Sequence, residues 1–292
     1  MLLIDELDEG YRVENSNLNL IILSLLRATD EIYNTCKNVG LNCLPILALR
    51  SDIFDSLEDN DLNKLDDYVL RLNWTTDEED PWSLKQIAEK RIAATLREKS
   101  IDIETTNYWN LVADDTSYPK GLWQYICNLT FSRPRDIIKL LKYCSNTCSS
   151  KLKITDVKKA EVTYSDWFYR EFRDEVQSFL PCWKEAMNCL SEVAKGKEKI
   201  AILNDRMTNN DEIKKWCQDN CKSAIDVIRI LFNYSVIGCI NENGRWIFKY
   251  KDDYFDFMPS YPYYCIHYGF CRKLRIPRSY DRMYLDTVQQ YQ

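Results

Sequence analysis

Apolar runs and amphipathic segments alternate at the start of the chain. Residues 2–4 and 44–49 are almost wholly apolar, and each run ends abruptly in charged or polar residues. Between them, residues 17–37 carry apolar side chains at helical spacing, and Gly40 is a suitable helix stop. Short apolar runs of this kind are typical of parallel strands buried on both faces, so the pattern predicts a strand–helix–strand unit. A third strand is predicted over residues 68–72.

Helical spacing of apolar residues dominates after this unit. Ser83 and Gln86 form a predicted capping box, and apolar positions with helical period follow it. Pro134 suits the first turn of another helix, whose apolar residues share one face. The polar stretch 145–153 is the predicted junction between this helical part and the remainder of the chain.

The remainder of the chain combines helices with one hairpin signal. Asn243-Gly244 lies between two strand-like runs, and Asn-Gly favours the two-residue turn that joins antiparallel strands. Two helices joined by a tight turn and followed by a hairpin are typical of a winged helix-turn-helix domain. The predicted elements are helices over 166–180, 182–194, 211–219 and 223–233, then strands over 236–240 and 245–250.

Composition excludes some classes of protein. The chain is 45% hydrophobic and 29% charged, as expected for a globular protein, and its net charge of −6 does not favour nucleic-acid binding by the whole molecule. No apolar run reaches the roughly 18 residues of a membrane helix, so we expect no membrane partner. The acidic start lacks the basic region of a signal peptide, which predicts a cytoplasmic protein.

Cysteine and histidine usage disfavours metal chemistry. The 12 cysteines are scattered and form no C-x-x-C pair, although two C-x₃-C pairs occur. A zinc site needs four ligands, and His267 is the single histidine, so buried reduced thiols are the favoured interpretation. His267 itself is expected to be structural.

Acidic residues follow the first predicted strand, at the end where parallel sheets place ligand chemistry. Asp5 corresponds to the Walker-B carboxylate that holds Mg²⁺ in P-loop NTPases. Asp8 or Glu9 is the candidate for positioning the attacking water, with Glu6 as a rival. A solvated acidic strand end is the alternative interpretation.

Arginines supply the positive charge that phosphoryl transfer requires. Arg50 and Asp52 follow the second predicted strand, where Arg50 is a candidate γ-phosphate sensor. Arg133 and Arg135 begin the helix at Pro134, and Arg135 is a candidate reporter of lid closure over the nucleotide. The alternatives remain open: Arg50 can pair with a nearby aspartate, and Arg135 can pair with a carboxylate on a neighbouring helix.

Four strings, IDELDEGY, LRSDIFDSL, LNWT and RPRDIIKLL, resemble a prokaryotic P-loop ATPase family akin to STAND and AAA+-type NTPases. The string IGCINENGRWIFKYKD resembles the winged-helix-like tail of that family. The resemblance favours Asp5, Asp8 and Glu9 over Glu6, whose position varies in the family pattern. It implies ATP and Mg²⁺ as ligands and a setting in bacterial defence or regulation.

The 292 residues depart from that family in one respect. They contain no G-x-x-x-x-G-K-[ST], the loop that holds the phosphates. The expected fold is therefore α/β plus mostly α: a truncated parallel-sheet P-loop NTPase core over 1–74, a helical lid over 75–150 and a winged-helix domain over 151–292. The expected function is the C-terminal portion of a nucleotide-dependent ATPase switch, inactive without its P-loop half.

Two kinds of partner follow from this interpretation. The first is the missing P-loop half, or a second copy that associates through the exposed sheet edge. The second belongs to the alternative function, a winged-helix module that contacts nucleic acid or protein without hydrolysis. Basic residues interleaved with tyrosines favour nucleic-acid binding, but nearby aspartates weaken the positive electrostatic field of these residues. Packing of the winged helix against the nucleotide domain is therefore the favoured role. The basic residues are Arg272, Lys273, Arg275, Arg278 and Arg282.

Overall fold

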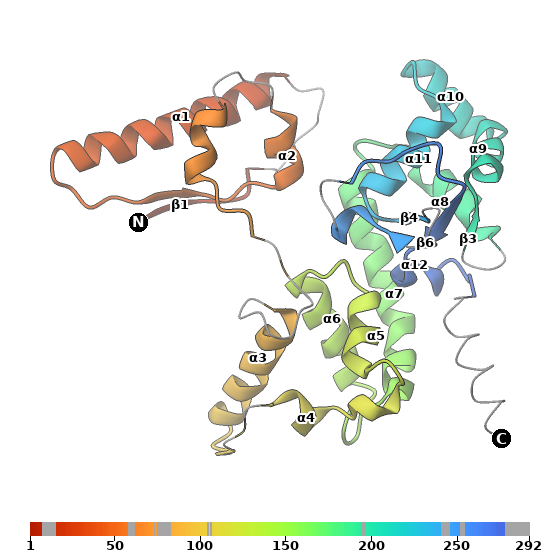
Figure 1. Cartoon of the computed structure of the whole chain (residues 1–292), viewed down its shortest axis with the longest axis horizontal. Helices are drawn as coiled ribbons and strands as arrows, with labels where there is room; N and C mark the ends of the chain where they lie inside the picture. Colours follow the sequence, from red (N-terminus) through yellow and green to blue (C-terminus); the bar gives the residue numbers. More distant parts are fainter. Residues whose placement is uncertain are drawn as a thin grey trace. The chain divides into compact units, whose positions relative to one another are not determined.

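The computed structural model describes residues 1–7, 16–57, 62–72, 74, 83–103, 105, 107–193, 197–240, 246–251 and 255–277. Contacts within the chain define two compact units, Met1–Asn73 and Trp74–Gln292, which we call unit 1 and unit 2. The described residues form a mixed α/β fold that is mostly helical (Figure 1). It contains a two-stranded parallel sheet and a four-stranded antiparallel sheet.

Unit 1 is built on a strand–helix–strand motif. Strands β1 and β2 are parallel neighbours, with Leu2 opposite Pro45 and Ile4 opposite Leu47. This confirms the predicted parallel pairing, and helix α1 connects the two strands as predicted. The elements are β1 (Leu2–Ile4), α1 (Ser16–Asn38), β2 (Pro45–Leu47), α2 (Ser51–Ser56) and the 3-10 helix η1 (Leu62–Tyr68).

The predicted strand over residues 68–72 is wrong. The chain forms a 3-10 helix as far as Tyr68, and residues 69–72 have no regular structure. Leu70 is 83% exposed and Leu72 is 69% exposed. A strand needs a neighbour that accepts and donates its ladder hydrogen bonds, and within the described residues the parallel sheet contains β1 and β2 alone. Apolar composition without such a neighbour did not produce a strand.

Ten helices of unit 2 are described, and several begin where the sequence predicted. Ser83 caps α3 by accepting a hydrogen bond from the Gln86 N–H at 3.2 Å, and Pro134 opens α6. The helices are α3 (Leu84–Glu98), α4 (Trp109–Val112), α5 (Leu122–Asn128), α6 (Pro134–Ser145), α7 (Ile154–Val176), α8 (Trp183–Ser191), α9 (Ile200–Thr208), α10 (Asp211–Asp219), α11 (Ala224–Asn233) and α12 (Tyr268–Cys271).

Helix α7 begins earlier than the predicted residue 166. The Asp156 carboxylate accepts a hydrogen bond from the Lys153 N–H at 3.1 Å and so closes the first turn. Val157, Ala160 and Tyr164 already face the core from this first half of the helix. The charged residues between them hid the helical period in the sequence.

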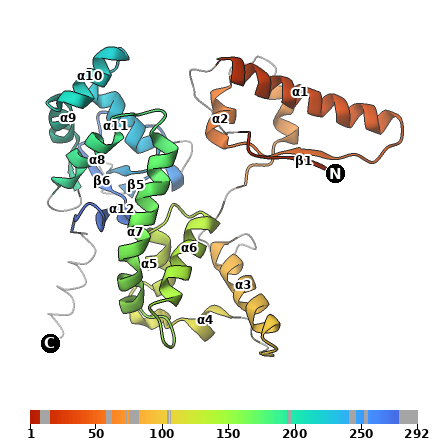
Figure 2. The ribbon, with the colours of Figure 1, turned by 180° about the vertical axis from the view of Figure 1, so that it is seen from behind.

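The antiparallel sheet of unit 2, of which Figure 2 labels β5 and β6, has the strand order β3-β6-β4-β5. β4 pairs with β5, with Cys239 opposite Ile247, which confirms the predicted antiparallel pairing. The second strand is shorter than the predicted 245–250, because the chain forms a 3-10 helix over Lys249–Lys251. The predicted tip at Asn243-Gly244 lies outside the described residues. Strands β3 and β6 were not predicted. The four strands are β3 (Lys197–Lys199), β4 (Ile237–Ile240), β5 (Trp246–Ile247) and β6 (Tyr263–Ile266).

One hydrophobic core runs through unit 2 from Leu84 to Ile276. It joins the helices expected in the lid to the elements expected in the winged-helix part, because α6 and α12 both pack on α7. Aromatic side chains fill its centre, where Phe168 lies 4.6 Å from Phe131 and 4.9 Å from Phe270 between ring centroids. None of the described helices is long and apolar enough to cross a membrane.

Candidate functional site

The carboxyl ends of β1 and β2 bring two of the predicted site regions together. The Ile4 carbonyl accepts a hydrogen bond from the Ala48 N–H at 2.9 Å, which extends the ladder past the end of both strands. Asp5 therefore leaves the sheet beside Ala48, two residues before Arg50. Asp5 is exposed, and its Oδ1 accepts a hydrogen bond from the Glu6 N–H at 2.8 Å. Asp5, Glu6 and Arg50 thus share one end of the parallel sheet.

Backbone geometry turns each strand sharply at this edge. Glu6 adopts a left-handed conformation with φ of 62°, which is uncommon for a residue with a side chain. Arg50 is the extended residue before α2, and its carbonyl accepts a hydrogen bond from the Phe54 N–H at 3.0 Å. Buried Ile53 anchors α2 to the unit. Arg50, half-buried, is held by its backbone at the sheet end.

Three residues predicted for this edge lie wholly or partly outside the described residues. Asp8 and Glu9, the candidates for positioning water, lie outside the described residues. The same holds for the side chain of Asp52, although its backbone lies in the first turn of α2. Within the part of the chain that the structure describes, no three His, Cys, Asp or Glu side chains form a group suited to a metal ion.

Arg133 and Arg135 lie in unit 2 and both pair with helix α7. Arg133 contacts the Glu175 carboxylate at 2.9 Å, and Arg135 contacts Glu171 at 2.6 Å. These contacts match the alternative interpretation of Arg135, a pair with a carboxylate on a neighbouring helix. The Arg135 side chain remains 61% exposed, so the pair is open to solvent and to competing anions.

Asp136 is the buried acid of the same turn, and the sequence prediction missed it as a titrating group. Its side chain is 2% exposed, and its Oδ2 accepts a hydrogen bond from the Phe131 N–H at 3.2 Å. Burial raises the pKa of Asp136 to about 6, although the nearby Arg133 and Arg135 favour the charged form. The signal available in the sequence was its position in the first turn of a helix after Arg133-Pro134.

The basic residues near the C-terminal end are partly engaged in structure. Lys273 contacts the Asp166 carboxylate at 2.5 Å, and its backbone N–H donates to Ser165 Oγ at 2.9 Å. Arg272 and Arg275 are exposed on either side of buried Leu274. The other two predicted members, Arg278 and Arg282, lie outside the described residues.

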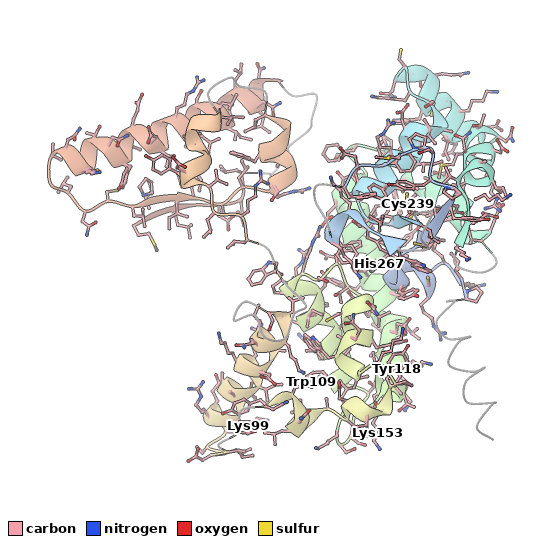
Figure 3. All side chains as sticks on the ribbon, in the orientation of Figure 1. Lys99, Trp109, Tyr118, Lys153, Cys239 and His267 are labelled. Carbon is pink, nitrogen blue, oxygen red and sulfur yellow. The ribbon has the colours of Figure 1, made fainter. Side chains whose placement is uncertain are left out.

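His267 is buried in the core of unit 2, where Figure 3 labels it. Its Nδ1 accepts a hydrogen bond from the Gly269 N–H at 3.1 Å, which caps α12. Aromatic rings of Phe131, Phe248 and Tyr250 surround the imidazole. Burial and, to a smaller extent, the positive charge of Lys251 lower the pKa of His267 to about 3, so the ring is neutral near pH 7.

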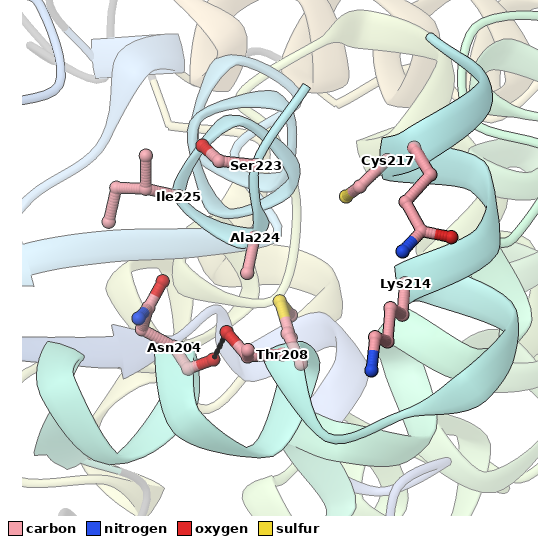
Figure 4. Close-up of a pocket in the computed structure, with 9 residues that line it drawn as sticks. Asn204, Thr208, Lys214, Cys217, Ser223, Ala224 and Ile225 are labelled. Carbon is pink, nitrogen blue, oxygen red and sulfur yellow. Dashed lines mark hydrogen bonds between the residues drawn. The ribbon is translucent and has the colours of Figure 1, made fainter. Parts of the chain in front are cut away.

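A pocket of about 450 Å³ lies among α9, α10 and the start of α11 (Figure 4). Met207, Cys217 and Ala224 give it an apolar lining, and the Thr208 hydroxyl donates to the Asn204 carbonyl at 2.8 Å on its rim. Burial raises the pKa of Cys217, which therefore stays a protonated thiol. Lys214 is the charged residue of its lining, and one lysine does not supply the convergent charged groups that phosphate binding requires.

Comparison with known proteins identifies one resemblance in unit 2. Residues 82–173 match the family described as the FunZ-associated C-terminal helical domain. This segment contains helices α3 to α6 and most of α7, and thus the arginines at the start of α6. Neither a curated protein nor a solved structure matches the chain.

Proposed function

We propose that this chain carries the Walker-B and sensor half of a P-loop ATPase and acts as a nucleotide-dependent switch once a phosphate-binding loop is supplied. The supporting observation is the parallel pairing of β1 and β2, which puts Asp5 and Arg50 at one sheet end. A carboxylate for Mg²⁺ and a cation for the γ-phosphate occupy that edge in nucleotide-binding α/β sheets.

The uncovered sheet of unit 1 supports the same proposal. Strand β2 alternates between half-buried Pro45 and Leu47 and exposed Ile46, yet all three residues are apolar. Leu3, opposite Ile46 in the ladder, is 60% exposed. Parallel strands with apolar residues on both faces are almost always covered on both faces. The exposed face therefore suits the strands and helices of a P-loop half as its partner.

The decisive experiment supplies a phosphate-binding loop. The coding sequence upstream of codon 1 is searched in all frames for G-x-x-x-x-G-K-[ST], and the joined protein is assayed for MgATP binding and hydrolysis. We expect micromolar binding by the joined protein and none by these 292 residues. Asp5→Asn should abolish hydrolysis in the joined protein, and the matched control Asp30→Asn, in the middle of α1, should leave it unchanged. Tight MgATP binding by the 292 residues alone would contradict the proposal.

Arg50 is tested in the same joined protein. Arg50→Ala should weaken ATP binding while leaving ADP binding near its original value, because ATP alone presents a γ-phosphate. Arg27→Ala, on helix α1, is the control for loss of a positive charge in unit 1. Equal affinities of the Arg50 variant and the parent for both nucleotides would favour a structural role for Arg50.

A winged-helix binding module is the second candidate function. Helices α10 and α11 followed by the antiparallel pair β4–β5 support it. The exposed residues of α11 are limited to Arg229 and Asn233, and Arg229 contacts the Asp226 carboxylate. A helix that reads a DNA groove needs several free polar side chains. We therefore propose packing within the protein, and not base readout, as the use of α11.

A further inference from the structure

Cys36 and Cys43 flank the tight turn that joins α1 to β2. The Cys36 carbonyl accepts a hydrogen bond from the Leu41 N–H at 2.8 Å, and Gly40 takes the left-handed φ of 74° that this helix end requires. The Cys43 N–H then donates to the Leu41 carbonyl at 3.1 Å. The chain thus doubles back over the end of α1 and brings the two cysteines together.

The two thiols are in contact and accessible. Both cysteines are free, and both are half-buried. Burial raises the pKa of Cys36, and a hydrogen-bonding contact with the Cys43 thiol raises it further. Most other cysteines, such as Cys239 and Cys271, are buried in the core of unit 2, where oxidants have little access. The Cys36/Cys43 pair therefore differs from the packing thiols in both exposure and proximity.

We propose that Cys36 and Cys43 form a reversible intramolecular disulfide when the protein meets hydrogen peroxide. The raised pKa of Cys36 keeps its thiol protonated, so the Cys43 sulfur, as the thiolate, attacks a peroxide oxygen: an S–O bond forms, the O–O bond breaks and hydroxide leaves. The Cys36 thiol then gives up its proton and attacks the resulting sulfenic sulfur, so that the S–S bond forms and the sulfenic oxygen leaves as water. Two thiols and one peroxide give one disulfide and two waters. A dithiol reductant reverses the bond.

The disulfide would join the C-terminal end of α1 to the segment that leads into β2. Cys43 precedes the amino end of β2, whereas Asp5 and Arg50 lie beyond the carboxyl ends of the strands. The bond therefore fixes the strand–helix–strand frame of unit 1 from the end opposite the candidate nucleotide site. The inference does not depend on the proposed ATPase function.

Peptide mapping of the full chain tests the pair directly. Trypsin cleaves after Lys37, between the two cysteines, so Cys36 and Cys43 fall in separate peptides with one cysteine each. Dilute protein is treated with one equivalent of hydrogen peroxide, alkylated and digested without reductant. We expect the two peptides to appear as a linked pair, smaller than their sum by two hydrogens, and to separate after dithiothreitol.

Matched variants give the controls. Cys36→Ser and Cys43→Ser should each abolish the linked pair, while Cys148→Ser, at a half-buried cysteine of unit 2, should leave it unchanged. The peptide map of the parent protein tests the proposal even if a variant fails to fold. Full alkylation of Cys36 and Cys43 after peroxide, or a link from either one to Cys221 in their place, would overturn the proposal.

Discussion

Units 1 and 2 use apolar residues in opposite ways. Unit 2 buries most of its aromatic and aliphatic side chains in one large core, beside a smaller cluster around Ile240 and Phe248. In unit 1 the buried apolar side chains among the described residues are Ile22, Leu23, Ile53 and Leu57, and many large ones are exposed. Exposed apolar surface on this scale is typical of contact sites. The comparison teaches that unit 2 has a large core of its own, whereas unit 1 exposes apolar side chains of the kind that our proposal assigns to a partner.

The largest expected effect is a cavity in the core of unit 2. Phe172 is 2% exposed and packs against Trp183, Tyr234 and Phe270. Phe172→Ala should lower the free energy of unfolding of unit 2 by about 3–5 kcal/mol, because burial is lost and a cavity remains. All eight tryptophans lie in unit 2, so urea unfolding followed by tryptophan fluorescence reports this unit.

Leu3→Ala in unit 1 is the comparison variant for that measurement. Its side chain is already 60% exposed, so truncation should leave the tryptophan transition unchanged. An equal loss of stability from Leu3→Ala and Phe172→Ala would show that the two units unfold together. It would contradict the inferred difference between the core of unit 2 and the exposed apolar surface of unit 1.

The second expected effect is a pH dependence of the stability of unit 2, which contains both His267 and Asp136. The folded pKa of His267 is about 3, below its ordinary value of 6.5, so its contribution to stability is lost as pH falls below about 6.5. Asp136 has a raised folded pKa of about 6, so its contribution grows as pH falls from about 6 towards 3.8. The two contributions oppose each other between about pH 6 and pH 4.

The substitution Asp136→Asn removes the contribution of Asp136 to this pH dependence and leaves that of His267. As the pH falls from 6 to 4, the variant should lose stability relative to the parent, by at most about 1.4 kcal/mol per pH unit. Urea unfolding at several pH values, followed by tryptophan fluorescence, measures the difference. Parallel pH profiles for the parent and the variant would show that Asp136 titrates normally in the folded protein.

The third effect concerns the exposed sheet of unit 1. Leu3 and Ile46 are cross-strand neighbours on its uncovered face. If that face holds a second copy or a P-loop half, Leu3→Lys with Ile46→Lys should weaken association by about 2 kcal/mol or more, over tenfold in the dissociation constant. Analytical ultracentrifugation measures it, with Leu70→Lys, outside the sheet, as control. An equal weakening of association by Leu70→Lys would indicate non-specific hydrophobic association.

Local sequence signals predicted the secondary structure of unit 1 well, but they did not predict which groups the candidate site residues contact. The apolar runs and Gly40 located β1, α1 and β2, because each signal acts over a few residues. Strands β3 and β6 escaped prediction, since β3 pairs with β6 some 66 residues further along the chain, and β6 lies between β3 and β4 in the sheet. The placement of Asp5 and Arg50 at one sheet end followed from parallel pairing. The partners of Arg133 and Arg135 are set by the packing of α6 on α7, which no local pattern encodes.

The smallest expected effect tests those arginines. Arg135 and Glu171 form an exposed pair, so a double-mutant cycle with Arg135→Ala and Glu171→Ala should give a coupling energy of about 0.5 kcal/mol. Urea unfolding followed by tryptophan fluorescence is precise enough when the four proteins are measured together. Such weak coupling leaves Arg135 available to a phosphate at little cost in stability, as a nucleotide sensor requires. A coupling energy above about 2 kcal/mol would make the pair a structural bond of unit 2 and remove Arg135 from the proposed switch.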